Sequence, residues 1–209
     1  MNISFLLKSN TKYYEFRYKL SINILAILYL FKENIVMIRK AVESDINAIA
    51  DTYNELLTYE EKHGSNSNWK LGVYPTIKVP QEKIPTGTMY VLDEEGEICA
   101  SMILNHFQAE EYKEIDWIYP GEGEEILVIH TLCIPPQKAG RGYGQKMVDY
   151  AKEFARKLGC KAIRIDTYAH NEPAKSLYKK NGFRIAGYYE SLLEGLIKEE
   201  LAFLEYKIN

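Results

Sequence analysis

The chain has 209 residues, of which 46% are apolar and 26% are charged, so it is long enough to bury one sizeable core. Acidic residues outnumber basic ones 29 to 26, and no basic stripe is interleaved with aromatic side chains, so a nucleic-acid partner is not expected. The three cysteines are widely spaced within apolar runs, which is typical of buried thiols in a reducing cytoplasm. No Cys/His cluster has zinc spacing, so no metal is expected.

The first 36 residues differ from the rest because they contain no Gly, Pro or Asp. We interpret residues 1–36 as an upstream extension without function and Met37 as a candidate for the true start. A docking or membrane-touching helix and a targeting signal are the alternatives. The apolar patch at residues 24–31 is far shorter than the ~20 residues of a membrane span, so no membrane partner is expected.

Apolar residues recur at helical spacing from Ile46 to Leu57, which predicts an amphipathic helix over about residues 45–62 with Ser44 as its N-cap. Residues 63–85 scatter Gly, Ser, Asn and Pro among isolated aromatic residues, which predicts an ordered irregular loop with room for a short helix. Residues 88–93 and 97–107 flank a Glu-Glu-Gly turn and predict a β-hairpin.

Residues 126–134 are apolar on both faces, as expected of a central strand. A glycine-rich turn then leads to a predicted helix over about residues 143–158, which Gly159 ends. A β-branched strand at residues 161–168 precedes a short helix capped by Asn171. Residues 183–189 and 201–208 predict two closing strands. The order predicts one mixed α/β domain over residues 37–209.

The glycine-rich turn places Gly140, Gly142 and Gly144 at alternate positions between a strand and a helix. Such a turn leaves unpaired backbone N–H groups at the positive end of the helix dipole, which favours a phosphate. Gln145 stands where a Walker A motif needs lysine and where a dinucleotide fingerprint needs its last glycine, so both motifs are disfavoured. Asp166, at the end of the next strand, is the only residue that supports the dinucleotide fingerprint. A glycine-rich connection without a ligand is a further alternative.

The run IPPQKAGRGYGQKM, preceded by VIHTLC and followed by NEPAKSLYKKNGF, resembles the GCN5-related N-acetyltransferase (GNAT) family, and the resemblance covers residues 37–209. It implies a single α/β domain with a mixed, mostly antiparallel sheet flanked by helices. In that fold two central parallel strands splay apart and acetyl-CoA lies in the gap. It also implies an enzyme, an acyl-CoA-dependent N-acetyltransferase (acyltransferase), with acetyl-CoA as co-substrate.

The resemblance further implies that the amides of residues 140–145 cradle the pyrophosphate. Ala139 stands where the family has Gln or Arg, so a register beginning at Gln137 stays open. One N–H of the strand edge at residues 132–134 is expected to polarise the acetyl carbonyl. Asn171 matches a pantetheine contact, with its role as a helix cap equally open. The expected cofactor-binding residues are Leu132, Cys133, Ile134, Lys138, Ala139, Gly140, Arg141, Gly142, Tyr143, Gly144, Gln145 and Asn171.

Tyr178 occupies the position of the family's general acid, and a phenol of pKa about 10 can donate to a thiolate of pKa about 8.5. The alternative is that Tyr178 only packs its helix on the sheet.

Two residues of the central strand have the chemistry of a base. His130 lies in its middle, where some arylalkylamine acetyltransferases of the family have a histidine, and Glu125 lies at its start; a mechanism without a side-chain base is the third option. Period-two alternation predicts that His130 shares a face with Val128, Leu132 and Ile134.

The acceptor pocket is expected between residues 68–76 and 104–117, walled by Trp69, Tyr74, His106 and Trp117. Acidic residues at positions 110, 111, 114 and 116 are expected to attract a cationic amine. The alternatives are aromatic residues that anchor loops and an acidic face that is only solvated.

We expect direct attack on acetyl-CoA by a primary amine of a small molecule, in the cytoplasm; a protein amine and a longer acyl group are alternatives. A catalytically silent CoA-binding sensor or scaffold module is the rival of another class, which Ala139 favours and Tyr178 disfavours. A homodimer is an open option because the family often dimerises.

Overall fold

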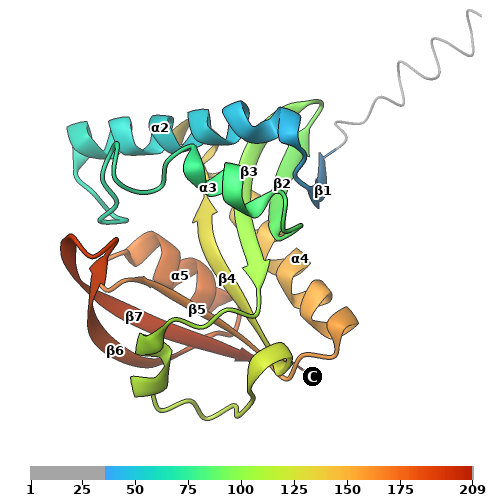
Figure 1. Ribbon diagram of the computed structural model, residues 1–209, viewed down its shortest axis with the longest axis vertical. Coiled ribbons are helices and arrows are strands. Elements are labelled where there is room, and N and C mark those ends of the chain that lie inside the picture. Colours follow the sequence, from blue (N-terminus) through green and yellow to red (C-terminus); the bar gives the residue numbers. More distant parts are fainter. Residues whose placement is uncertain (1–35, 209) are drawn as a thin grey trace, which may run out of the picture. The chain divides into compact units, whose positions relative to one another are not determined.

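The computed structural model describes residues 36–208, and the predicted extension over residues 1–36 lies outside this part except for its last residue. Seven strands form one sheet in the order β1-β2-β3-β4-β5-β7-β6 (Figure 1). Every neighbouring pair is antiparallel except β4 and β5, which run parallel. The strands are β1 (Val36–Lys40), β2 (Met89–Glu94), β3 (Glu97–Asn105), β4 (Ile126–Cys133), β5 (Ala162–Tyr168), β6 (Arg184–Leu193) and β7 (Ile197–Lys207).

Helices and short 3₁₀ turns connect these strands. The mixed, mostly antiparallel sheet with one parallel pair confirms the fold class expected from the sequence. The strand β1 is not among the predicted elements because its few residues are too short for a periodic pattern. The helices are α2 (Ile46–His63), α3 (Lys78–Lys83), α4 (Tyr143–Leu158) and α5 (Glu172–Lys180), and the turns are η1 (Glu43–Asp45), η2 (Glu110–Glu114), η3 (Gly123–Glu125) and η4 (Pro136–Lys138).

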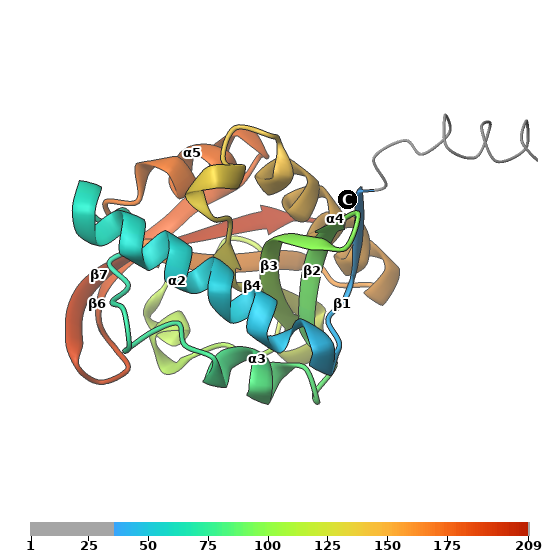
Figure 2. The same ribbon diagram turned by 90° about the horizontal axis from the view of Figure 1, so that it is seen from above.

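The helices cover both faces of the sheet. Successive residues of a strand point to opposite faces. In β2, Met89 and Val91 pack with residues of α2 and α3, whereas Tyr90 and Leu92 pack with residues of α4. Figure 2 accordingly shows α2 and α3 on one side of the strands and α4 and α5 on the other. The segment at residues 106–125 covers β4, β5 and β7 through a third apolar cluster.

The two helices nearest the glycine-rich turn begin and end as the sequence predicts. The N-cap of α4 is Gly142, with φ 79°, and its C-cap is Gly159, with φ 74°. Both backbones are in the left-handed region that glycine adopts without a steric penalty. In α5 the Asn171 side chain accepts a hydrogen bond from the amide of Ala174. The helix before β5 in the chain and the helix after it therefore both have a defined start.

Ser44 does not cap α2, contrary to the sequence prediction. It lies inside the 3₁₀ turn η1, and α2 begins after Asp45, which makes no side-chain cap. The Asp45 carboxylate is held instead by the Arg39 guanidinium, at 2.7 Å. An ion pair to β1 thus replaces the expected cap.

A β-bulge interrupts the pairing of β4 with β3. His130 and Cys133 are three residues apart, yet their partners on β3 are only two residues apart. Thr131 lies in this bulge with φ 48°, a left-handed conformation that β-branched residues rarely adopt. A bulge bends its strand and increases the local twist. Pairing of β4 with β5 stops at Ile129, and the two strands diverge beyond it (Figure 1).

The bulge also shifts the alternation of side chains along β4. Leu132 and Ile134 pack against the cluster that contains Ile129, on the side of α4 and α5. His130 lies on the opposite face with Val128. The prediction that His130 shares a face with Leu132 and Ile134 is therefore wrong, because period-two alternation does not continue through an inserted residue.

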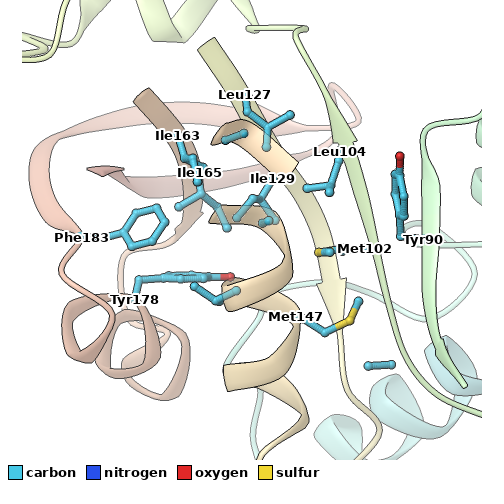
Figure 3. Packing of buried hydrophobic residues seen from close by; sticks show 14 of the residues in the cluster. Tyr90, Met102, Leu104, Leu127, Ile129, Met147, Ile163, Ile165, Tyr178 and Phe183 are labelled. Carbon is cyan, nitrogen blue, oxygen red and sulfur yellow. The ribbon is translucent and has the colours of Figure 1, made fainter. Parts of the chain in front are cut away.

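The largest apolar cluster lies between the sheet and the helices α4 and α5 (Figure 3). Leu127 and Ile163 come from the two parallel strands, Met147 from α4 and Tyr178 from α5. Burial of each such side chain contributes about 1.5–3 kcal/mol. All three cysteines are buried and unpaired. Among residues 36–208, no helix is both long and apolar enough to cross a membrane.

Leu127→Ala should reduce the free energy of unfolding by about 2–5 kcal/mol, because it leaves a cavity beside the parting strands. Urea unfolding measures this as a lower transition midpoint at unchanged slope. Leu192→Ala, the same change at a side chain that is 57% exposed, is the matched control and should cost less than about 0.5 kcal/mol. Equal losses for the two variants would contradict the placement of Leu127 in the core.

Candidate functional site

The glycine-rich turn presents a row of unpaired backbone N–H groups. The amides of residues 140–145 have no hydrogen-bond acceptor within residues 36–208, and the first amide bonded in α4 is that of Lys146, to Gly142. Gly140 has φ 77° and Gly142 φ 79°. A Cβ at either position would meet no atom within 4 Å, so the space before these amides is open. Consecutive free amides at a helix N-terminus favour an anion.

Gly144 has a different role from the other two glycines. Its φ is not positive, and a Cβ there would lie 3.0 Å from Leu177 and 3.2 Å from Ile134. Contacts this short require the neighbours to move. Gly144 therefore lets α4 approach α5 and the end of β4, rather than supplying conformational freedom.

The two cations beside the turn are tied to the β2–β3 hairpin. The Lys138 ammonium lies 2.5 Å from the Glu97 carboxylate, and the Arg141 guanidinium lies 3.9 Å from Glu94. The Tyr143 hydroxyl also donates to Glu94, at 2.6 Å. These carboxylates offset part of the positive charge of Lys138 and Arg141. The backbone amides, not these side chains, remain the free donors.

Gln145 joins the turn to α5. Its side-chain amide exchanges two hydrogen bonds with the Asn181 side chain, of 2.7 and 2.9 Å, and also donates to Asp149. Ala139 is exposed, and its amide donates to Pro136. The row of unpaired amides therefore begins at Gly140.

One edge of β4 is left without a partner where the strands part. The register of β4 with β5 ends at the pair of Ile129 and Ile165, so the backbone of residues 132–134 does not pair with β5. Cys133 points to the α2 side, and burial raises the pKa of its thiol to about 12. This edge and the amides of residues 140–145 lie at the same end of β4.

Tyr178 lies on the face of the sheet that α4 and α5 cover, close to where β4 and β5 part. It is only 3% exposed, and Figure 3 shows it beside Phe183, extending from α5 towards Ile129 and Ile165. Burial, followed by the charge of Asp166, raises the pKa of the phenol well above its usual range. The hydroxyl therefore stays protonated across the physiological pH range.

His130 lies on the opposite face of β4, next to the bulge. Its Nε2 is 3.1 Å from Oδ1 of Asn105. Burial lowers the pKa of the imidazole, although the Asp166 carboxylate acts in the other direction. The ring is thus mainly neutral at neutral pH.

Glu125 lies at the other end of β4, in η3. Its carboxylate is 2.5 Å from the Lys161 ammonium, whose hydrogen bond lowers the pKa of Glu125. His130 is five positions further along the chain, about 16 Å away at the usual rise of a strand. The structure does not bring Glu125 together with Tyr178 or His130.

Tyr74 reaches the bulge itself, where its hydroxyl lies 2.5 Å from the Thr131 hydroxyl. Trp69 packs edge-on against Tyr74, with ring centroids 5.7 Å apart. Burial raises the pKa of Tyr74 to about 12. These two predicted pocket residues lie side by side, and Tyr74 bonds the residue that follows His130 in the chain.

His106 and Trp117 anchor the segment that covers β4 and β5. His106 Nδ1 bonds the carbonyl of Ile126, at 2.8 Å, near the start of β4. Trp117 donates to the carbonyl of Tyr112 at 2.7 Å and lies under the Arg164 guanidinium, 4.2 Å from its ring centroid. The Trp117 indole N–H and the His106 Nδ1 are thus occupied by contacts within the fold. The acidic residues at positions 110 and 111 likewise bond Lys113 and Ser191.

Asp166 on β5 was noted in the sequence only in connection with a dinucleotide fingerprint, and not as a residue of this site. It accepts a hydrogen bond of 2.5 Å from the Tyr112 hydroxyl, and its charge acts on His130, Tyr178 and Tyr74. The only sequence signal is its position at the carboxyl end of a buried strand. Its neighbours come from segments far apart in the chain.

Glu199 is a second carboxylate near this point. Burial raises its pKa, and its partner in the described residues is the side-chain amide of Asn68, at 3.2 Å. Asn68 has φ 61° and follows a loop whose Ser67 hydroxyl and amide bond the buried Glu60 carboxylate. Glu60 thus ties this loop to the end of α2, and Asn68 ties the loop to β7.

Asn171 is occupied as a helix cap. Its Oδ1 accepts from Ala174, and its Nδ2 donates to the Thr167 hydroxyl, each at 3.2 Å. One N–H of the side-chain amide is left for another partner. Within residues 36–208, no three His, Cys, Asp or Glu side chains form a group that could hold a metal ion.

Comparisons with known proteins agree with this geometry. A model described as "Acetyltransferase (GNAT) family" matches residues 48–183. An uncharacterized N-acetyltransferase of Bacillus subtilis is 25% identical over 173 residues, covering 82% of this chain and 96% of that protein. An acetyltransferase of the GNAT family from Streptococcus agalactiae has the same fold, with a TM-score of 0.68 and 22% identity over 83% of this chain and 95% of its own. A Salmonella typhimurium structure that includes its cofactor acetyl-CoA has a TM-score of 0.60 at 16% identity, over 84% and 95% of the two chains.

Tyr74→Phe and Thr131→Val should each lower the free energy of unfolding, because each leaves one hydroxyl of a buried pair unbonded. The double variant should lose less than the sum, by about 1 kcal/mol. Chemical denaturation of the four proteins measures this coupling. The matched control combines Tyr74→Phe with Thr52→Val, whose hydroxyl bonds Ile49 instead, and should be additive. Additivity of the first pair would contradict the bond between Tyr74 and the bulge.

Proposed function

This chain belongs to the acetyltransferase (GNAT) family, and we propose that it transfers the acetyl group of acetyl-CoA directly to a primary amine of a small molecule. One observation carries the proposal. Unpaired amides over residues 140–145 follow the end of a strand that parts from its parallel neighbour beside the buried residue Tyr178. An anion cradle, a free strand edge and a proton donor are what a CoA thioester requires at one place.

The residues of the turn fit a pyrophosphate. The amides of residues 140–145 supply donors without charge, and the open space before Gly140 and Gly142 lets an anion approach the backbone. The unpaired edge at residues 132–134 is suited to pantetheine amides, and one of its N–H groups is suited to the acetyl oxygen. The thioester of acetyl-CoA supplies the acetyl group; the residues of this chain bind, orient and move protons.

Tyr178 is proposed as the general acid. Its phenol stays protonated at neutral pH, because burial raises its pKa. It is therefore in the protonated form that a general acid needs to donate to the departing thiolate sulfur as the carbon–sulfur bond breaks. Its position between α5 and the parting strands supports this role over packing alone.

His130 is proposed as the base that takes a proton from the acceptor amine. Because its pKa is lowered, the imidazole is unprotonated at pH 7 and ready to accept. The acid limb of kcat/KM should accordingly lie below the ordinary histidine value of about 6.5. Glu125 is not part of the proposal because it pairs with Lys161 at the far end of β4.

The acceptor is proposed to enter on the face of His130, past Tyr74 and Trp69. Asp166 and Glu199 have no ion-pair partner within residues 36–208, and their charges favour an ammonium group there. They take the role that the sequence assigned to the acidic residues at positions 110–116. His106 and Trp117 are proposed to support this wall from behind.

Tyr178→Phe should lower kcat by about 10²- to 10⁴-fold with little change in acetyl-CoA affinity, because it removes a proton donor and leaves the cradle intact. Thiol release from acetyl-CoA over a panel of primary amines measures turnover, and calorimetry measures affinity.

Tyr189→Phe is the matched control, since this tyrosine is 40% exposed on β6, and it should keep wild-type turnover. An unchanged kcat in Tyr178→Phe would remove the general acid from the mechanism. Tight acetyl-CoA binding by the wild type without turnover on any amine would favour the silent CoA-binding module instead.

A further inference from the structure

Asn105 at the end of β3 lies between a backbone amide and the ring of His130. Its Oδ1 accepts a hydrogen bond of 2.8 Å from the amide of Phe107 and lies 3.1 Å from His130 Nε2. A backbone N–H can only donate, so the Asn105 atom that faces it is the carbonyl oxygen and not the amino group. The orientation of this side chain is therefore settled by Phe107.

An amide oxygen carries no proton, so the hydrogen bond to His130 needs its proton on Nε2. In a neutral imidazole the other nitrogen, Nδ1, then holds the lone pair. We infer that Asn105 is a positioning residue, which holds His130 in the Nε2–H form and makes Nδ1 the atom that accepts the proton of the acceptor amine. This inference rests on the proposed role of His130 as the base.

The sheet register brings the two residues together. Asn105 pairs with Val128, and His130 is the next residue of β4 on the same face. The bulge begins directly after His130, at Thr131, so the ring is held at the last regular position of the strand. Phe107 packs near the imidazole, with ring centroids 6.4 Å apart. The contact thus follows from backbone pairing and not from a mobile loop.

Neutrality is the property that distinguishes asparagine from aspartate here. Both offer an oxygen to Nε2–H, but a carboxylate would also stabilise the imidazolium and raise the pKa of His130. The other charges that act on the ring are the Asp166 carboxylate on β5, which accepts from Tyr112, and Lys83 on α3. A hydrogen bond between the ring and the Phe107 backbone also raises the pKa of His130. Asn105 orients the imidazole without adding to these influences.

Nitrogen NMR of the full wild-type chain tests the tautomer without any activity measurement. Long-range ¹H–¹⁵N correlation of the His130 ring distinguishes a protonated nitrogen from one with a lone pair. We expect Nε2 protonated and Nδ1 unprotonated at pH 7.5, and His130→Gln identifies the signals. A proton on Nδ1 would overturn the inference while leaving the proposed acetyl transfer in place.

The pH profile of kcat/KM tests whether the tautomer matters to the reaction. Asn105→Asp keeps an oxygen for both Phe107 and His130 but adds a charge, so the acid limb should move up by about 1–3 pH units. Asn54→Asp, the same change on an exposed position of α2, is the matched control and should leave the limb in place.

Asn105→Leu removes the acceptor and should lower kcat/KM at every pH, with part of the activity restored in Asn105→Asp above the shifted limb. A purely structural role would lower activity without moving the limb. An unmoved limb in Asn105→Asp, with active enzyme, would overturn Nδ1 of His130 as the proton acceptor.

Discussion

The separation of β4 from β5 is the constraint on which the site depends. Parallel neighbours in a sheet normally saturate each other's backbone groups along their whole length. Here the inserted residue at Thr131 bends β4 away, and the pairing ends at Ile129. The same bend frees one edge of β4, opens the approach to Tyr178 and turns His130 and Leu132 to opposite faces. Tyr74 supports the strained Thr131 through a hydroxyl pair.

The donors and acceptors of the candidate site are mainly neutral groups. Burial favours the neutral forms of both a phenol and an imidazole, so it raises the pKa of Tyr178 and lowers that of His130. The unpaired backbone amides of residues 140–145 are likewise neutral donors, while the neighbouring cations are paired with carboxylates of the β2–β3 hairpin. The Asp166 carboxylate is the main charge that acts on both groups, and it raises the pKa of each.

Local patterns were enough to predict most of the fold. Helical periodicity located α2 and α4, and the strand–glycine–helix order predicted unpaired amides at the start of α4; the resemblance to the GNAT family narrowed these amides to residues 140–145. Two kinds of feature were beyond such patterns. The bulge at Thr131 has no signature in an apolar run. Leu132 and Ile134 were therefore wrongly expected on the same face of β4 as His130. The roles of Asp166 and Glu199 depend on contacts between distant segments, which spacing along the chain does not encode.

Amide hydrogen exchange of the full chain, with and without saturating acetyl-CoA, tests the central claim most directly. The amides of residues 140–145 have no acceptor in the described structure and should exchange rapidly in the free protein. They should become protected with acetyl-CoA and not with NAD, while amides in the middle of α4 change little. Unchanged exchange of residues 140–145 at saturating acetyl-CoA would contradict the account, since the free amides would then have no role in binding it.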